Sequence, residues 1–161
     1  MKNYRIIYYL LGIIAFQNCK SQQNKDLSFT YERQFIKNKK TSKSFTYSSQ
    51  SSVYENKQLY PDGNYQSKRV TINLSKANIK EIYDLYLKLN PKNLRNCLYI
   101  GNELVYSSSI IFDFKDGKKS PDLICNKDEN DESKYRKIEE KLYEFILPTY
   151  RLKYPDEFIG K

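Results

Sequence analysis

Residues 27–35 read Leu-Ser-Phe-Thr-Tyr-Glu-Arg-Gln-Phe, and apolar or aromatic residues alternate with polar ones through most of this stretch. Successive side chains of an extended strand point to opposite faces, so the alternation predicts a β-strand with one buried face. The pattern resumes in residues 45–53, around a serine-rich middle. Lysine-rich residues 37–43 separate the two segments and predict a solvated turn, so we expect a β-hairpin.

Two later segments have the period of an amphipathic helix. Ser75 is a favourable N-cap, because its hydroxyl accepts a hydrogen bond from an N–H of the first turn, and Asn90-Pro91 is expected to end this helix. Ser133 is expected to cap the second helix, which Pro148 ends or bends. The apolar residues predicted to share a face are Ile79, Ile82, Tyr83, Leu85, Tyr86 and Leu89 in the first helix, and Tyr135, Ile138, Leu142, Phe145 and Ile146 in the second.

Further strands are expected around the first helix. Turn residues 60–64 precede a short strand at 70–74, and residues 106–114 alternate well before an Asp-Gly turn into a return strand at 118–125. Residues 91–104 are interpreted as a loop with a short extended piece. This order predicts an α+β fold, an antiparallel sheet of about five strands with two helices packed on one face.

The N-terminus has the features of an export signal. Lys2 and Arg5 precede an apolar run at residues 6–16, and no acidic residue occurs before Asp26. The run is shorter than the roughly 20 residues that span a bilayer, so residues 1–18 are predicted to be a signal peptide.

The segment Phe16-Gln17-Asn18-Cys19 resembles the lipobox of bacterial lipoproteins, in the form that Bacteroidota use. The resemblance implies cleavage before Cys19 and acylation of its sulfur, with palmitate among the chains. Residues 19–26 would then be the lipidated cysteine and a tether, and residues 27–161 a single domain. Ordinary signal cleavage after Ser21 is the alternative. The resemblance further implies the cell envelope, in the outer rather than the inner membrane.

Cys97 and Cys125 lie within the predicted domain and form a candidate disulfide. Export places the domain in an oxidising compartment, where such bonds persist. Closing the loop between these residues would stabilise the fold by roughly 3.5 kcal/mol on the chain-entropy argument. Two buried thiols are the alternative.

The composition argues against several kinds of chemistry. The chain has no histidine, which removes histidine-dependent triads and histidine metal ligands. Asp128, Asn130, Glu132 and Glu139 have part of a calcium-loop spacing, but Ser133 stands where glycine is needed, so no metal site is predicted. The net charge is +9, but basic and acidic residues are interspersed, so no nucleic-acid partner is predicted. No catalytic residue and no cofactor are predicted.

The 16 tyrosines suggest how the domain works. Tyrosine offers a large contact area at little entropic cost, so exposed tyrosines favour partner binding. Tyr47, Tyr54, Tyr60 and Tyr65 cluster around the first hairpin and the turn at 60–64, and form the candidate binding patch. We therefore expect a non-enzymatic, lipid-anchored module that binds an envelope protein or a glycan. The alternatives are a structural accessory of a membrane complex and, third, a carboxylate-dependent hydrolase.

Overall fold

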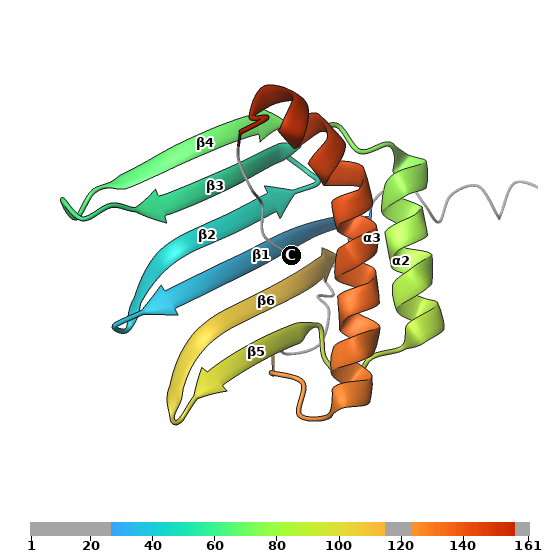
Figure 1. Ribbon diagram of the computed structural model, residues 1–161. Coiled ribbons are helices and arrows are strands. Elements are labelled where there is room, and N and C mark those ends of the chain that lie inside the picture. The colour runs from blue at the N-terminus through green and yellow to red at the C-terminus, as the bar shows by residue number, and fades with distance from the viewer. Residues whose placement is uncertain (1–26, 115–123, 157–161) are drawn as a thin grey trace, which may run out of the picture.

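The computed structural model describes residues 27–114 and 124–156, which form one six-stranded sheet and two helices (Figure 1). All neighbouring strands are antiparallel, in the order β4-β3-β2-β1-β6-β5. The α+β class and the antiparallel sheet are confirmed, but the sheet has six strands rather than about five. The strands are β1 (Ser28–Lys37), β2 (Lys40–Ser48), β3 (Val53–Leu59), β4 (Tyr65–Thr71), β5 (Arg95–Ile100) and β6 (Glu103–Asp113).

The additional strand comes from two segments whose extent differs from the prediction. Residues 91–104, interpreted as a loop, contain β5 and the start of β6, joined by a turn at Gly101 with φ of 59°. The expected strand at 70–74 lies earlier, as β4. The expected return strand at 118–125 falls largely on residues 115–123, outside the described residues.

The turn within the lysine-rich segment 37–43 is also shorter than expected. Lys37 pairs directly with Lys40, so only Asn38 and Lys39 form the turn, and both have positive φ, 52° and 60°. A two-residue turn of this handedness matches the twist of the adjoining strands. The hairpin itself is therefore formed, with β2 beginning at Lys40.

The first predicted helix is confirmed as α2 (Lys76–Leu89). The Ser75 hydroxyl accepts a hydrogen bond from the backbone N–H of Asn78, whose side chain in turn accepts one from the Ser75 N–H. This reciprocal pair satisfies two donors that a helix start leaves without a partner. The helix ends at Asn90 in the left-handed conformation, with φ of 46°.

The second helix, α3 (Glu129–Lys153), begins earlier than predicted and continues through Pro148, which was expected to end or bend it. Its N-cap is Asp128 rather than Ser133, because the Asp128 carboxylate accepts a hydrogen bond from the backbone N–H of Asp131 at 2.8 Å. Pro148 does not end the helix, since buried Ile146 and Tyr150 hold the turns on either side of it against the core.

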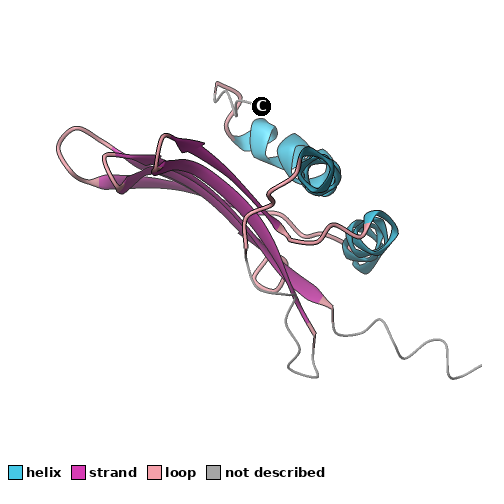
Figure 2. Cartoon of the chain, turned by 90° about the horizontal axis from the view of Figure 1, so that it is seen from below, coloured by secondary structure: helices cyan, strands magenta, loops and turns pink. Residues whose placement is uncertain are grey.

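Both helices lie on the same side of the curved sheet (Figure 2). Ring contacts join the layers: Tyr54 packs against Tyr150 of α3 at 5.1 Å between ring centroids, and Phe112 packs against Tyr83 of α2 at 5.3 Å. The buried apolar core is Phe29, Tyr31, Phe45, Tyr47, Tyr54, Val70, Ile72, Ile82, Leu94, Ile110, Phe112, Tyr135, Ile138, Leu142, Ile146 and Tyr150.

The predicted disulfide is present between Cys97 and Cys125, whose Cα atoms are 5.6 Å apart. It joins β5, at one edge of the sheet, to the segment that leads into α3. The backbone N–H of Asn126 also donates to the carbonyl of Arg95 at 2.8 Å, so this segment runs beside the β5 edge. The β5–β6 hairpin brings Cys97 opposite Ser107 of β6.

Replacing both Cys97 and Cys125 with serine should lower the free energy of unfolding by about 3.5 kcal/mol, because the unfolded chain gains the freedom of the opened loop. Urea unfolding of this variant in a Cys19→Ser background measures the loss without interference from a third thiol. Reducing the parent protein should reproduce the same loss. A change well under 1 kcal/mol would contradict a stabilising role for the bond.

Candidate functional site

The structure separates the four tyrosines of the predicted patch into two groups. Tyr47 and Tyr54 are fully buried, and the Tyr47 hydroxyl donates to the carbonyl of Ile72 at 2.9 Å. Tyr60 and Tyr65 are exposed, at 38% and 53%, at the β3–β4 turn. A surface formed by all four tyrosines is therefore not present.

Strand register explains why the two tyrosines are buried. Tyr47 pairs with Tyr31 of β1 on one side and with Tyr54 of β3 on the other, so the three rings occupy one row of the helix-covered face. Residues two apart on a strand share a face, and Phe45 and Tyr47 both belong to the alternating pattern of the sequence. That alternation already indicated a core position for Tyr47.

The strands continue beyond the two helices, as Figure 2 shows, and leave one end of the sheet without a helix above it. We call this region, around the turns at 38–39, 60–64 and 101–102, the helix-free end. Apolar side chains are exposed there: Leu98 is 56% and Ile100 70% exposed. Exposed apolar groups that lie together commonly mark binding sites, which single scattered ones do not.

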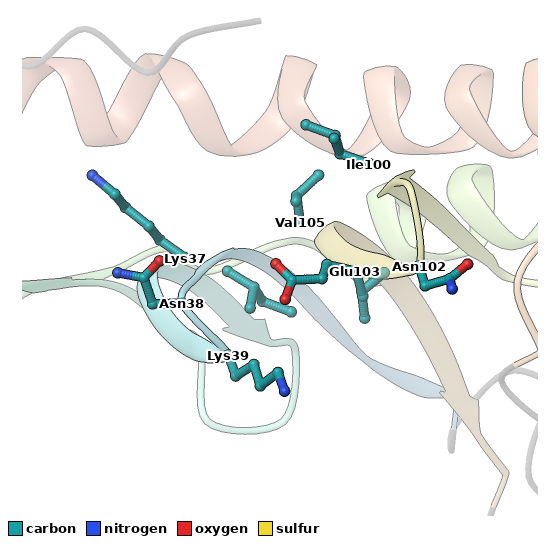
Figure 3. Close-up of a pocket in the computed structure, with 9 residues that line it drawn as sticks. Lys37, Asn38, Lys39, Ile100, Asn102, Glu103 and Val105 are labelled. Atoms are coloured by element: carbon teal, nitrogen blue, oxygen red, sulfur yellow. The ribbon is translucent and has the colours of Figure 1, made fainter.

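Two neighbouring turns of the helix-free end enclose a pocket of about 500 Å³ (Figure 3). Ile100 and Val105 extend to one side of the strands in this view, and Lys39 to the other. The volume is within the range of small-molecule or side-chain binding pockets. The lining residues are Ile36, Lys37, Asn38, Lys39, Ile100, Asn102, Glu103, Leu104 and Val105.

The pocket combines an apolar wall with positive charge. Lys37 and Lys39 line it, and Lys40 follows in the same hairpin; none of the three forms an ion pair with another residue in the ranges described. Glu103 is the single carboxylate among the lining residues. Carboxylate-dependent glycoside hydrolysis uses two such groups flanking the scissile bond, and the lining residues supply one.

A buried polar cluster lies where the helix-covered part of the sheet meets the helix-free end. The Tyr31 hydroxyl donates to Glu139 of α3 at 2.7 Å and lies 2.6 Å from the Tyr143 hydroxyl. The buried Arg33 guanidinium stacks over Phe45, 4.6 Å from the ring centroid, and lies 5.1 Å from that of Tyr143. Burial raises the pKa of the Glu139 carboxyl, although the Tyr31 hydrogen bond and the positive charge of Arg33 oppose this shift.

This cluster positions α3 and leaves little room for a ligand. Arg33 and Glu139 are 6% and 8% exposed, and their surroundings are aromatic rings rather than a cavity. The Arg33 guanidinium reaches the edge of the helix-free end, where it lies 5.5 Å from the ring of Phe35. One feature of the sequence pointed to this cluster, namely that the charged Arg33 occupies an inward position of β1.

Within the described ranges, no group of three or more acidic or cysteine side chains is arranged to hold a metal ion. All three acids with calcium-loop spacing have partners in the protein, and Glu132 forms an ion pair with Arg136. Asp128 caps α3, and its carboxylate lies 3.4 Å from the ammonium of Lys92, while Glu139 belongs to the buried cluster.

No protein-family model, no curated protein and no solved structure matches this chain. Neither of the helices in the described ranges is long and apolar enough to cross a membrane.

Replacing Glu139 with glutamine keeps an acceptor oxygen for Tyr31 but removes the ionisable group. Because burial raises the pKa of Glu139, the folded protein retains a proton that the unfolded chain releases around its ordinary value of 4.5. The free energy of unfolding of the parent should therefore fall, relative to that of Glu139→Gln, as the pH rises above 4.5.

Urea unfolding between about pH 4 and pH 8 measures this difference. Glu140→Gln makes the same chemical change at an exposed position of α3 and controls for the loss of one charge. Parallel curves for the parent and Glu139→Gln would contradict the proposed burial of an ionisable carboxyl.

Proposed function

We propose that this protein is a lipid-anchored, non-enzymatic binding module of the bacterial cell envelope. It engages a protein or a glycan with the helix-free end of its sheet. The observation that carries this proposal is the exposed apolar surface there, including Leu98, Ile100 and the adjoining pocket. Removing such a surface from water on binding contributes roughly 25 cal/mol per Å² of apolar area, which gives a partner a reason to associate.

The lipobox-like segment supports an anchor on the opposite side of the domain. Cys19 precedes β1 by only a short tether, and β1 begins at the helix-covered end of the sheet (Figure 1). The ten residues of β1 extend about 33 Å at the usual rise of a strand. With Cys19 acylated and in the outer membrane, the helix-free end would therefore point away from the bilayer and toward a partner.

This orientation determines what the lysines of the β1–β2 hairpin would face. A juxtamembrane lysine is worth about 1 kcal/mol against anionic headgroups, but only within about a Debye length of the surface. Lys37 and Lys40 lie at the far end of β1 from the tether. We therefore propose that they face a binding partner rather than the anchoring membrane.

Replacing Cys19 with alanine tests the anchor. The lipid chains supply about 0.8 kcal/mol per buried methylene group, so the variant should move from the membrane fraction to the soluble fraction. Mass spectrometry of the parent should find Cys19 as the acylated first residue. An intact Met1 with an unmodified Cys19 thiol would contradict the anchor.

A photo-cross-linking residue at Ile100 tests the binding surface in cells. It should yield a discrete adduct, because Ile100 is 70% exposed at the proposed contact. The matched position is Leu87, which is 55% exposed but lies on α2, away from the helix-free end, and should yield none. Equal labelling from both positions, or no adduct from Ile100, would contradict the proposed function.

A further inference from the structure

The two edges of the sheet differ in how far other segments cover their edge strands. At the β5 edge, the outward carbonyl of Arg95 accepts a hydrogen bond from Asn126, and the disulfide ties Cys97 to Cys125. The pairing of β5 with β6 is also irregular between Leu98 and Tyr99. Such features block the addition of another strand. The β4 edge has a regular register throughout its pairing with β3, and the residues that the structure describes place no such cover along its first half.

Hydrogen bonds at both ends of the β3–β4 hairpin show which backbone groups of β4 point outward. Tyr60 donates to the carbonyl of Asn64 at 2.9 Å, and Ile72 donates to that of Ser52 at 2.7 Å. Hydrogen-bonded and non-hydrogen-bonded pairs alternate along an antiparallel ladder, so the even-numbered residues of β4 bond to β3. The odd-numbered residues therefore direct their N–H and C=O groups to the open edge.

Arg69 confirms this direction. Its carbonyl accepts hydrogen bonds from the Lys153 ammonium at 2.9 Å and the Tyr154 hydroxyl at 3.3 Å, both beyond the edge. The end of α3 thus covers the edge at Arg69. The outward backbone groups of Tyr65 and Ser67, nearer the helix-free end, have no hydrogen-bond partner among the residues that the structure describes.

The charge near the β4 edge favours some pairing segments over others. β3, β4 and the last turn of α3 carry five basic side chains, namely Lys57, Lys68, Arg69, Arg151 and Lys153, against Glu55 alone. Glu55 is already paired with Arg69, at 2.9 Å, and with Lys57, at 3.7 Å. A second copy of β4 would bring Lys68 and Arg69 close to like charges, which destabilises strand pairing, whereas acidic side chains would be attracted.

We propose that an extended acidic segment of a partner protein adds to β4 as a seventh strand. It exchanges backbone hydrogen bonds with Tyr65 and Ser67, and its carboxylates are attracted by the net positive charge of β4 and the end of α3. This inference rests on the proposed binding function and specifies the class of partner. It makes the partner a protein rather than a glycan, because a glycan has no strand backbone to pair.

Ser67→Pro tests strand addition most directly. Proline removes the outward N–H of residue 67 but no hydrogen bond to β3, since Ser67 belongs to a non-hydrogen-bonded pair with Lys57, and edge strands tolerate proline. Ser67→Ala is the matched control. Both variants lose the hydrogen bond from the Ser67 hydroxyl to Glu55, but only proline loses the N–H.

The first probe is a capped peptide of alternating glutamate and valine, titrated onto the full-length protein in detergent. It should bind, more weakly as salt increases, and should slow hydrogen exchange at the amides of Tyr65 and Ser67. Ser67→Pro should weaken binding about fivefold or more, and Ser67→Ala less than about twofold, given roughly 1 kcal/mol per hydrogen bond. A lysine–valine peptide should not bind.

The exchange measurement needs no variant, so it decides the question even if Ser67→Pro folds poorly. No binding of the glutamate–valine peptide, unprotected amides, or equal affinities of the two Ser67 variants would each overturn strand addition.

The second probe is the native partner, detected as the Ile100 adduct. Ser67→Pro should deplete the adduct and Ser67→Ala should retain it. An adduct that survives Ser67→Pro overturns strand addition and leaves the binding function standing. Absence of the adduct from the parent protein overturns the binding function itself.

Discussion

The placement of the helix layer depends on a polar contact between the central strand and α3, inside a largely apolar core. The Tyr31 hydroxyl of the central strand donates to Glu139 of α3 and lies beside the hydroxyl of Tyr143. A buried carboxyl without a partner would cost several kcal/mol, so α3 cannot slide along the sheet without breaking this contact. Apolar packing alone is less selective, because many positions bury a similar area. The contact therefore fixes how much of the sheet the helices cover.

What the helices leave uncovered follows from that placement. The strands are longer than the width of the helix layer, so one end of the sheet keeps apolar side chains in water (Figure 2). This end combines two kinds of chemistry. The pocket beside Ile100 offers side-chain contacts, and the β4 edge at Tyr65 and Ser67 offers backbone groups. A partner that used both would be recognised by its shape and by its extended conformation.

The parts of the fold with a strong local signal were predictable. α2 follows from its apolar period and from the Ser75 cap, and β1 follows from its alternation. β5 was predicted only as a short extended piece around Leu98 to Ile100, because Arg-Asn-Cys-Leu-Tyr-Ile lacks the alternation of a half-buried strand. Its pairing with β6 is irregular between Leu98 and Tyr99. The predicted start of α3 was wrong because Asp128 and Ser133 are both acceptable caps. In the folded protein the cap is Asp128.

The candidate site was less predictable than the fold. The disulfide followed from the export signal and the number of cysteines, and the structure has it. The predicted tyrosine patch was wrong at Tyr47 and Tyr54: the alternation of β2 already indicated a core position for Tyr47, and the pairing register places Tyr54 on the same covered face. The helix-free end exists because the strands are longer than the part of the sheet that the helices cover. No local pattern in the sequence encodes this.

The central position of β1 has a mechanical consequence. β1 is hydrogen-bonded to β2 on one side and to β6 on the other, and it is the strand that follows the proposed lipid anchor in the sequence. With Cys19 anchored as proposed, tension between the bilayer and a bound partner would run along this strand, across hydrogen bonds that lie perpendicular to it. The hydrogen bonds on both sides of β1 would then be loaded in shear and at the same time. They would not break one after another. Such a domain would resist being pulled apart while its two ends are held.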